Sequence, residues 1–276
     1  MTDFADDLKL AMEAARTAGA ATLRYFRHGG PVSAEADVRE KSHDNPLTKA
    51  DLEADRILNE ALMGARPDYG WLSEETTDDA SRLDRTRVWV VDPIDGTKEF
   101  ISGTPEYAVS IGLVEDGVPV MGCVYNPATD EMFSAARGEG AFLNGTAIRT
   151  TNRADLQGAR CICSRSETKR GEWKPFESEF ELVEVGSIAF KYACLAAGRF
   201  DLTFTLTPKT EWDFCAGAAI IREAGGEVSD KDGKPFLYNQ PDPKVRSVLA
   251  SNGQLHAPLL ERLKDVPLAP DRRRKK

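Results

Sequence analysis

Val88-Trp89-Val90-Val91-Asp92-Pro93-Ile94-Asp95-Gly96-Thr97 joins a short apolar run to an acidic turn. The apolar run predicts a buried strand, which delivers the residues after it to a site at its end. Two aspartates three positions apart can direct both carboxylates into one pocket, while the bend at Pro93 can turn the Ile94 carbonyl inward. Carboxylate and carbonyl oxygens are ligands that suit Mg²⁺. Asp-Pro and Asp-Gly also form ordinary turns, but the whole hexapeptide after a buried strand favours a metal site.

The end of this stretch has the features of a phosphate site. Gly96 allows the backbone to approach a ligand closely, and Thr97 opens a short helix predicted over residues 98–101. The free N–H groups at the start of a helix suit a phosphate.

Three further acidic segments have weaker individual signals. Leu72-Ser73-Glu74-Glu75 ends a strand predicted over residues 69–72, Asp213 opens a predicted helix, and Asp51 lies near the start of another. Taken singly, they fit a solvated loop or the electrostatics of a helix terminus. Together they supply the converging carboxylates of a phosphatase with two or three metal ions, which needs no protein nucleophile.

The surrounding pattern predicts mixed helices and strands in two halves. The first half has helices over 3–27 and 50–65, a polar loop over 31–48, a hairpin of 107–114 and 118–125, and strands over 132–136 and 141–143. The second half alternates strands over 159–163, 201–206 and 247–250 with helices over 188–197, 213–223 and 256–263. We therefore expect domains over 1–152 and 153–266, followed by a disordered basic tail over 267–276.

Composition excludes some classes of function. The chain has 276 residues, a net charge of −9 and 41% hydrophobic residues, which is typical of a globular protein. Its acidic balance argues against binding a nucleic acid polymer or an anionic membrane. No apolar run approaches the roughly 20 residues that span a bilayer, and no secretory signal is visible at the start. We therefore expect a cytoplasmic protein that requires no membrane.

Cysteine and histidine spacing argues against other chemistries. The five cysteines form no Cys-x-x-Cys pair, and the three histidines are far apart. We expect the thiols to be reduced and mostly buried, and we expect neither a zinc site nor a thiol nucleophile.

The acidic segments carry a resemblance to a known family. Glu74-Glu75, the hexapeptide Asp92 to Thr97, and Trp212-Asp213 with Ala216-Gly217 resemble, in order and spacing, the lithium-sensitive, magnesium-dependent inositol monophosphatase superfamily. The resemblance implies an α+β fold, a layered α-β-α-β-α sandwich. It would have an antiparallel sheet in the N-terminal half and a smaller mixed α/β sheet in the C-terminal half.

The resemblance also implies the metal ligands. Glu74, Asp92 and the Ile94 carbonyl would bind one Mg²⁺, while Asp92, Asp95 and Asp213 would bind a second. A third, weaker Mg²⁺ would use Glu74.

Catalytic roles follow from the same resemblance. Asp51 would hydrogen-bond Thr97, and this pair with Glu74 would orient the attacking water. Backbone N–H groups of Gly96 and Thr97 would hold the phosphate.

Within the superfamily the chain looks most like the bacterial 3′(2′),5′-bisphosphate nucleotidases. That similarity rests on Lys98-Glu99-Phe100, Leu72-Ser73, Ser164-Arg165-Ser166, and Gly186-Ser187 with Lys191. It implies hydrolysis of the 3′-phosphate of adenosine 3′,5′-bisphosphate. The second phosphate of this substrate needs positive charge away from the metals, and Lys191 and Arg165 are the candidates to supply it; the alternative interpretation is that each is a solvated surface charge. The implied substrate-binding residues are Gly96, Thr97, Lys98, Ser164, Arg165, Ser187 and Lys191.

Other interpretations stay open. Asp213-Phe214-Cys215 and Ile188-Ala189-Phe190 depart from the nucleotidase pattern, which favours an inositol-1-phosphate or broader sugar-phosphate phosphatase as the alternative. A noncatalytic metal or nucleotide sensor is a third hypothesis, although the complete acidic set argues against it. The partner in either enzyme is a small phosphorylated metabolite, and the chain is expected to be a monomer or a homodimer.

Overall fold

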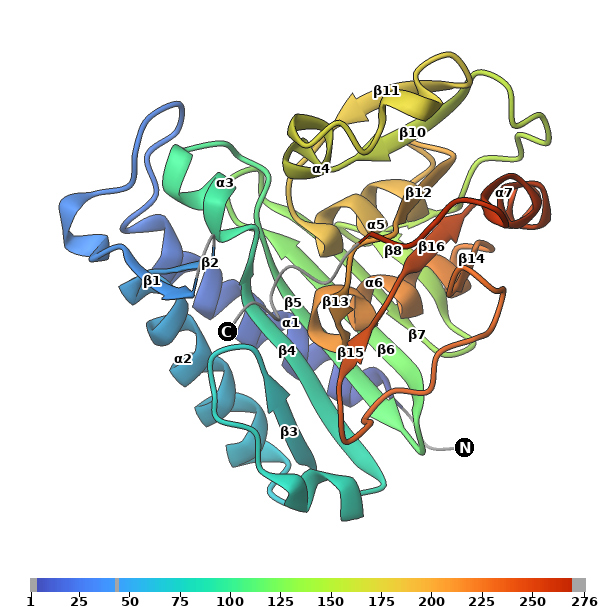
Figure 1. The fold of residues 1–276 in the computed structure, drawn as a ribbon. Coiled ribbons are helices and arrows are strands. Elements are labelled where there is room, and N and C mark those ends of the chain that lie inside the picture. The colour runs from blue at the N-terminus through green and yellow to red at the C-terminus, as the bar shows by residue number, and fades with distance from the viewer. Residues whose placement is uncertain (1–3, 43–44, 270–276) are drawn as a thin grey trace.

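The chain folds as five alternating layers of helices and sheets (Figure 1). This arrangement comes from a computed structural model, which describes residues 4–42 and 45–269. Helices α1 and α2 cover one face of a seven-stranded sheet, and α5 and α6 separate its other face from a five-stranded sheet. The layered α+β fold implied by the family resemblance is therefore confirmed.

The larger sheet has the strand order β3-β4-β5-β6-β7-β8-β9. Its strands are β3 (Gly70–Ser73), β4 (Arg87–Asp95), β5 (Ala108–Glu115), β6 (Val118–Asn126), β7 (Glu131–Ala136), β8 (Gly140–Leu143) and β9 (Thr146–Ile148). The expectation of an antiparallel sheet holds from β4 to β9, but β3 pairs with β4 in parallel. The chain returns between them through residues 74–86, which include the 3₁₀ helix Ala80–Asp84. The parallel pairing brings the carboxyl ends of β3 and β4 to one edge of the sheet.

Helices α1 (Ala5–Leu23) and α2 (Lys49–Ala65) pack against the outer face of this sheet. Their apolar residues contact Trp89, Val91 and Ile111 in a fully buried cluster. The helix expected over 3–27 is shorter at both ends among the described residues. The loop expected over 31–48 contains a 3₁₀ helix (Ala34–Ala36) and the short pair β1 (Arg39–Ser42) and β2 (Asn45–Leu47).

Helix α6 (Glu211–Glu223) packs closely on the inner face, because β5 and β6 present glycines to it. Gly112 and Gly122 lie opposite one another in these strands. A Cβ at Gly122 would overlap the carbonyl oxygen of Ala216, and one at Gly112 would crowd Cys215. This contact fixes the position of the first turn of α6. Its neighbour α5 (Ile188–Ala196) is buried beside it.

The smaller sheet has the order β11-β10-β12-β16-β14 and is mixed, as expected. Its strands are β10 (Ala159–Cys163), β11 (Phe180–Glu184), β12 (Leu202–Thr205), β14 (Glu227–Ser229) and β16 (Val248–Ser251). The sequence pattern missed β11 and β14. It also missed the short helix α4 (Arg165–Lys169), the 3₁₀ helix Lys174–Phe176 and the pair β13 (Lys209–Thr210) and β15 (Lys244–Val245). Helix α7 (His256–Leu263) packs on this sheet's outer face.

The structure tests some of the remaining expectations and leaves others open. The five cysteines are buried and unpaired, as predicted for reduced thiols. No helix in the described part of the chain has the length and apolar character needed to cross a membrane. Most of the predicted basic tail, residues 270–276, lies outside the described residues, and the domain boundary near residue 152 stays a prediction.

Candidate active site

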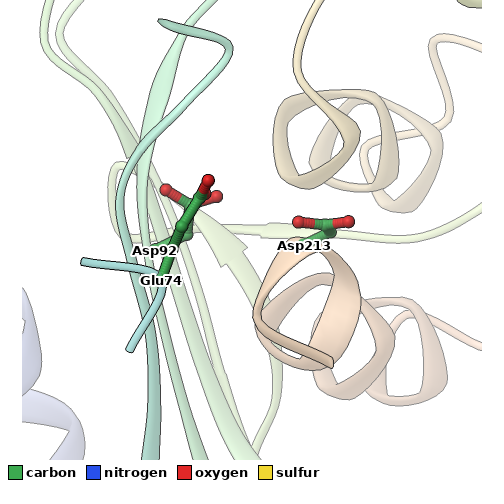
Figure 2. Close-up of side chains that lie close together, drawn as sticks. All are labelled: Glu74, Asp92 and Asp213. Carbon is green, nitrogen blue, oxygen red and sulfur yellow. The ribbon is translucent and has the colours of Figure 1, made fainter. Parts of the chain in front are cut away.

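Three carboxylates from separate elements meet at one end of the large sheet (Figure 2). Glu74 follows β3, Asp92 lies near the end of β4, and Asp213 lies in the first turn of α6. One oxygen from each of these three side chains lies within 4.8 Å of the others. The parallel pairing of Ser73 with Val91 places Glu74 beside Asp92, while the glycine contact of α6 brings Asp213 to face them.

Asp95 is held near this cluster by an irregularity in the strand and by α5. The pairing of β4 with β5 shifts between Asp92 and Asp95, so the two residues do not follow a regular alternation. The Asp95 Oδ2 atom accepts hydrogen bonds from the Ser187 hydroxyl, at 2.6 Å, and from the Ala189 N–H. These bonds tie the turn after β4 to the start of α5.

Burial and mutual repulsion disfavour the ionised form of these carboxylates, so their pKa values are raised. Burial, and then the charges of Glu74 and its neighbours, raise the pKa of Asp92 well above its ordinary value. Burial likewise raises the pKa of Asp95 to about 6, against hydrogen bonds from Ser187 and Ala189 that lower it. Burial, then Asp95 and Glu74, raise the pKa of Asp213 to about 7. A bound cation would relieve this repulsion, and the all-oxygen donor set fits Mg²⁺.

Thr97 and Asp51 lie together beside the acidic cluster. The Thr97 hydroxyl lies 3.3 Å from Asp51 Oδ1 and 3.2 Å from the Ile94 carbonyl oxygen. Asp51 is fixed by bonds to its Oδ2 from the Thr48 hydroxyl, at 2.6 Å, and from the Thr48 N–H, at 2.7 Å. Burial raises the pKa of Asp51 to about 6, although these Thr48 bonds lower it.

Gly96 is a position where glycine is required. Its φ is +96°, and an added Cβ would lie 3.0 Å from the Glu106 carbonyl oxygen and 3.1 Å from Ser187 Cβ. It precedes α3 (Thr97–Ser102). The conformation therefore lets the backbone turn directly from the acidic strand end into this short helix.

A pocket opens beside the cluster and contains most of the sequence-predicted residues. Those that line it are Glu74, Asp92, Ile94, Asp95, Gly96, Thr97, Lys98, Ser164, Ser187, Lys191 and Asp213. Asp51 lies behind Thr97 and does not line the pocket. Arg165 does not line it either: its guanidinium pairs with the carboxylate of Glu106 and donates to the Glu184 carbonyl oxygen.

The structure adds residues that sequence reasoning missed. Lys41 on β1 donates to Glu74 Oε1 at 2.8 Å and to Glu75 Oε1 at 2.7 Å. Burial lowers the pKa of Lys41, but Glu74 and Glu75 raise it by more. Lys209 also lines the pocket. No motif flagged either lysine, because their roles depend on β1 and β13, which are too short to predict from periodicity.

A sequence model of the inositol monophosphatase family matches residues 3–268. The chain belongs to this family. Its members are phosphatases that are generally magnesium dependent.

The similar proteins include both an inositol-1-monophosphatase and a bisphosphate nucleotidase. An inositol-1-monophosphatase of Mesorhizobium japonicum is 37% identical over 265 residues, covering 93% of this chain and 96% of the relative. The 3′(2′),5′-bisphosphate nucleotidase CysQ of Escherichia coli O157:H7 is 34% identical over 228 residues, covering 81% and 90%. The special likeness to nucleotidases expected from the sequence is therefore not confirmed.

Solved structures share the fold. The extragenic suppressor protein suhB from Bartonella henselae matches with a TM-score of 0.82 and 31% sequence identity. The match covers 95% of this chain and 99% of that one.

Proposed function

We propose that this family phosphatase is a magnesium-dependent phosphomonoesterase acting on inositol 1-phosphate or a related sugar phosphate. The convergence of Glu74, Asp92 and Asp213 carries the proposal. One oxygen of each of these three buried or half-buried carboxylates lies within 4.8 Å of the others, and this close convergence supports a site for metal ions. The adjoining pocket has room beside them for a small phosphate ester.

The donor set divides into two metal sites. Glu74, Asp92 and the Ile94 carbonyl would hold one Mg²⁺, and Asp92, Asp95 and Asp213 a second, with a weaker third at Glu74. When bound, Mg²⁺ supplies positive charge that polarises a phosphate ester and lowers the pKa of water. The Asp95 oxygen that binds Ser187 and Ala189 fixes the orientation of this carboxylate, which leaves its other oxygen for the site.

The chain's own groups would position the reactants. Asp51 accepts the hydrogen bond of the Thr97 hydroxyl, so the Thr97 oxygen, which lines the pocket, can accept a hydrogen bond from water. The Glu74 carboxylate can accept a hydrogen bond from the same water, and the two bonds together would orient it. The N–H groups of Gly96 and Thr97, at the turn into α3, would hold oxygens of the phosphate. Water orientation would thus come from Thr97, Asp51 and Glu74, and phosphate binding from the backbone of Gly96 and Thr97.

The choice of inositol or sugar phosphate rests on the relatives and on Arg165. The inositol-1-monophosphatase match has higher identity and coverage than the nucleotidase match. Arg165, one of two basic residues expected at a second phosphate, is engaged with Glu106. A bisphosphate nucleotidase is the second candidate, favoured by the buried Lys191 in the pocket lining.

Parallel assays of phosphate release test the proposal. We expect hydrolysis of inositol 1-phosphate in Mg²⁺, inhibition by lithium as in the family resemblance, and a higher kcat/KM than for adenosine 3′,5′-bisphosphate. A clear preference for the nucleotide would replace the first candidate with the second. If neither substrate nor a panel of sugar phosphates released phosphate, the noncatalytic sensor would be the better account.

A further inference from the structure

Asp55 is a buried carboxylate that the proposed function does not use. It lies on α2 and is 9% exposed. Its Oδ1 atom accepts a hydrogen bond from the Ser73 hydroxyl at 2.5 Å, and its Oδ2 atom accepts one from the Thr76 hydroxyl at 2.7 Å. Both oxygens of this carboxylate therefore bind hydroxyl groups of one short stretch of chain, residues 73–76.

That stretch contains Glu74, a ligand of the proposed metal site. Ser73 is the last residue of β3, and Thr76 lies two positions after Glu74. The backbone between the two hydroxyls is also held by β4, because the Glu74 N–H donates to the Val91 carbonyl oxygen at 3.2 Å. The position of Glu74 is thus set by two elements, by β4 through the backbone and by α2 through Asp55.

The two bonds to Asp55 are of a strong kind. Hydrogen bonds from a hydroxyl to a carboxylate are shorter and stronger than those between neutral groups. A buried carboxylate is also costly unless it is hydrogen-bonded. The bonds that stabilise Asp55 in its buried position therefore also fix Ser73 and Thr76 relative to α2.

The same face of α2 holds a second part of the proposed site. Asp51 lies four positions before Asp55, and side chains four apart on a helix are neighbours on one face. The Asp51 Oδ1 atom lies 3.3 Å from the Thr97 hydroxyl. Helix α2 therefore sets the Thr97 hydroxyl through Asp51 and the stretch around Glu74 through Asp55, so the two are held relative to one another.

We propose that Asp55 is a positioning residue for metal binding, which holds Glu74 where its carboxylate can bind the same ion as Asp92. The inference rests on the proposed function, because it takes Glu74 and Asp92 as Mg²⁺ ligands. Asp55 itself touches neither the metal nor the substrate. Removing groups that orient the ligands of a metal typically costs about ten- to a hundredfold in metal affinity or activity.

Mg²⁺ binding by matched variants tests this role. Asp55→Ala removes both bonds, while its control Glu60→Ala removes an exposed carboxylate that pairs with Arg56 on the same helix. Thr76→Val removes one of the bonds, and its control Thr77→Val makes the same change at the next, exposed position. In all five proteins we would measure Mg²⁺ binding by calorimetry and the Mg²⁺ concentration for half-maximal phosphate release from inositol 1-phosphate.

The expected effect is on metal affinity. Asp55→Ala should weaken Mg²⁺ binding and raise the half-maximal Mg²⁺ concentration by about tenfold. Saturating Mg²⁺ should restore kcat to within about twofold of wild type. Thr76→Val should give a smaller shift in the same direction, and both controls should match wild type. A purely structural role would lower Tm without changing the Mg²⁺ dependence, and that result would overturn the proposal.

Thr76→Val decides the question if Asp55→Ala does not fold. Thr76 is exposed, so its replacement leaves the packing of α2 intact. This variant also loses the 3.3 Å bond from the Trp71 indole N–H. Trp71→Phe, which loses that bond alone, should therefore bind Mg²⁺ as wild type does. Equal Mg²⁺ affinity in Thr76→Val and Thr77→Val would then overturn the proposal.

Failure of the proposed function has a different signature. If the wild-type protein neither bound Mg²⁺ nor released phosphate, the metal assignment would fail. Amide hydrogen exchange in the metal-free proteins would then test the positioning of Glu74 alone, because the Glu74 N–H is bonded to Val91. Faster exchange of this amide in Asp55→Ala than in Glu60→Ala would support the positioning role, and equal rates would overturn it.

Discussion

The two sides of one pocket differ in how far their charges are balanced within the protein. The acidic wall, which we define as Glu74, Asp92, Asp95 and Asp213, gathers four carboxylates from the ends of β3 and β4 and the start of α6. The lysine wall, which we define as Lys191 and Lys209, sets two ammonium groups beside the carboxylates of Glu167 and Glu99. Burial and neighbouring charges raise pKa values on the acidic wall, whereas the lysine wall already contains part of its counter-charge.

This difference predicts which wall needs a bound ion. The acidic wall is held together by the fold against its own repulsion, so it gains most from cations. The lysine wall has carboxylate counter-charge in Glu167 and Glu99, so it does not depend on added ions in the same way. Changes to the acidic wall should therefore reduce activity much more than changes to the lysine wall.

The largest expected effect follows from Asp95→Asn. This replacement keeps the side-chain shape but removes one charge from the acidic wall, and the orienting bonds from Ser187 and Ala189 lose their ionic character. We expect kcat/KM for inositol 1-phosphate to fall by about a hundredfold or more, because metal charge drives the reaction. Asp68→Asn, an exposed site away from the pocket, should behave as wild type. Near-full activity of Asp95→Asn would refute the metal assignment.

The second largest effect is expected from metal removal and pH, which both change the charge balance of the acidic wall. The folded pKa values of Asp51 and Asp95 are raised to about 6 and that of Asp213 to about 7, from an ordinary value of 3.8. At pH values between 3.8 and these raised pKa values, the folded chain binds more protons than the unfolded chain. The free energy of unfolding therefore falls as pH rises. The extra stability is complete below about pH 4 and is lost as pH rises through about 6 to 7.

Thermal melts in a chelator and in Mg²⁺ would measure this dependence. Without metal, the contribution of the acidic wall should lower Tm from pH 5 to pH 8. With Mg²⁺ the decline should be smaller, because the cation replaces the protons as counter-charge and binds the folded state. The same pH profile in both conditions would mean that the acidic wall holds no Mg²⁺.

The packing that brings Asp213 to the acidic wall gives a third, smaller effect. Gly122→Ala would place a Cβ against the Ala216 carbonyl oxygen of α6. We expect a loss of about 1–3 kcal/mol in the free energy of unfolding from overpacking, with weaker Mg²⁺ binding because Asp213 moves with the helix. In the control Gly64→Ala, an exposed position on α2 with open space, stability should be unchanged or higher. Denaturant melts and Mg²⁺ titration would measure both properties.

The smallest effect is expected from Arg165→Lys. Arg165 pairs with Glu106 and does not line the pocket. Loss of the two-pronged pairing should lower Tm slightly and change KM for either substrate by less than about twofold, since partly exposed ion pairs contribute little. A large rise in KM for adenosine 3′,5′-bisphosphate alone would return Arg165 to the substrate site that the sequence suggested.

The sequence predicted the acidic wall better than the lysine wall for a physical reason. Glu74, Asp92 and Asp213 follow or open regular elements whose apolar periodicity marks them clearly. The convergence of these three carboxylates still depends on the parallel pairing of β3 with β4 and on the contacts of Gly112 and Gly122 with α6. No local sequence pattern specifies either feature. The acidic cluster was foreseeable mainly through the family resemblance.

Lys209 and its partner Glu167 lie on elements that the sequence pattern missed, whereas Lys191 lies on a predicted helix. Glu167 lies on α4, only five residues long, and Lys209 on β13, only two residues long. Elements this short carry no readable periodicity. Arg165 was assigned to the substrate by motif, but its partner Glu106 is 59 positions away in the sequence, and only the folded chain brings the two together.

The central claim is that the acidic wall makes this chain a metal-dependent phosphatase. Phosphate release from inositol 1-phosphate tests it most directly, measured first in a chelator and then as Mg²⁺ is restored. The account predicts no release in the chelator and full recovery with Mg²⁺ in the wild-type protein, but no recovery in Asp95→Asn. Equal release with and without Mg²⁺, or recovery in Asp95→Asn matching wild type, would contradict it.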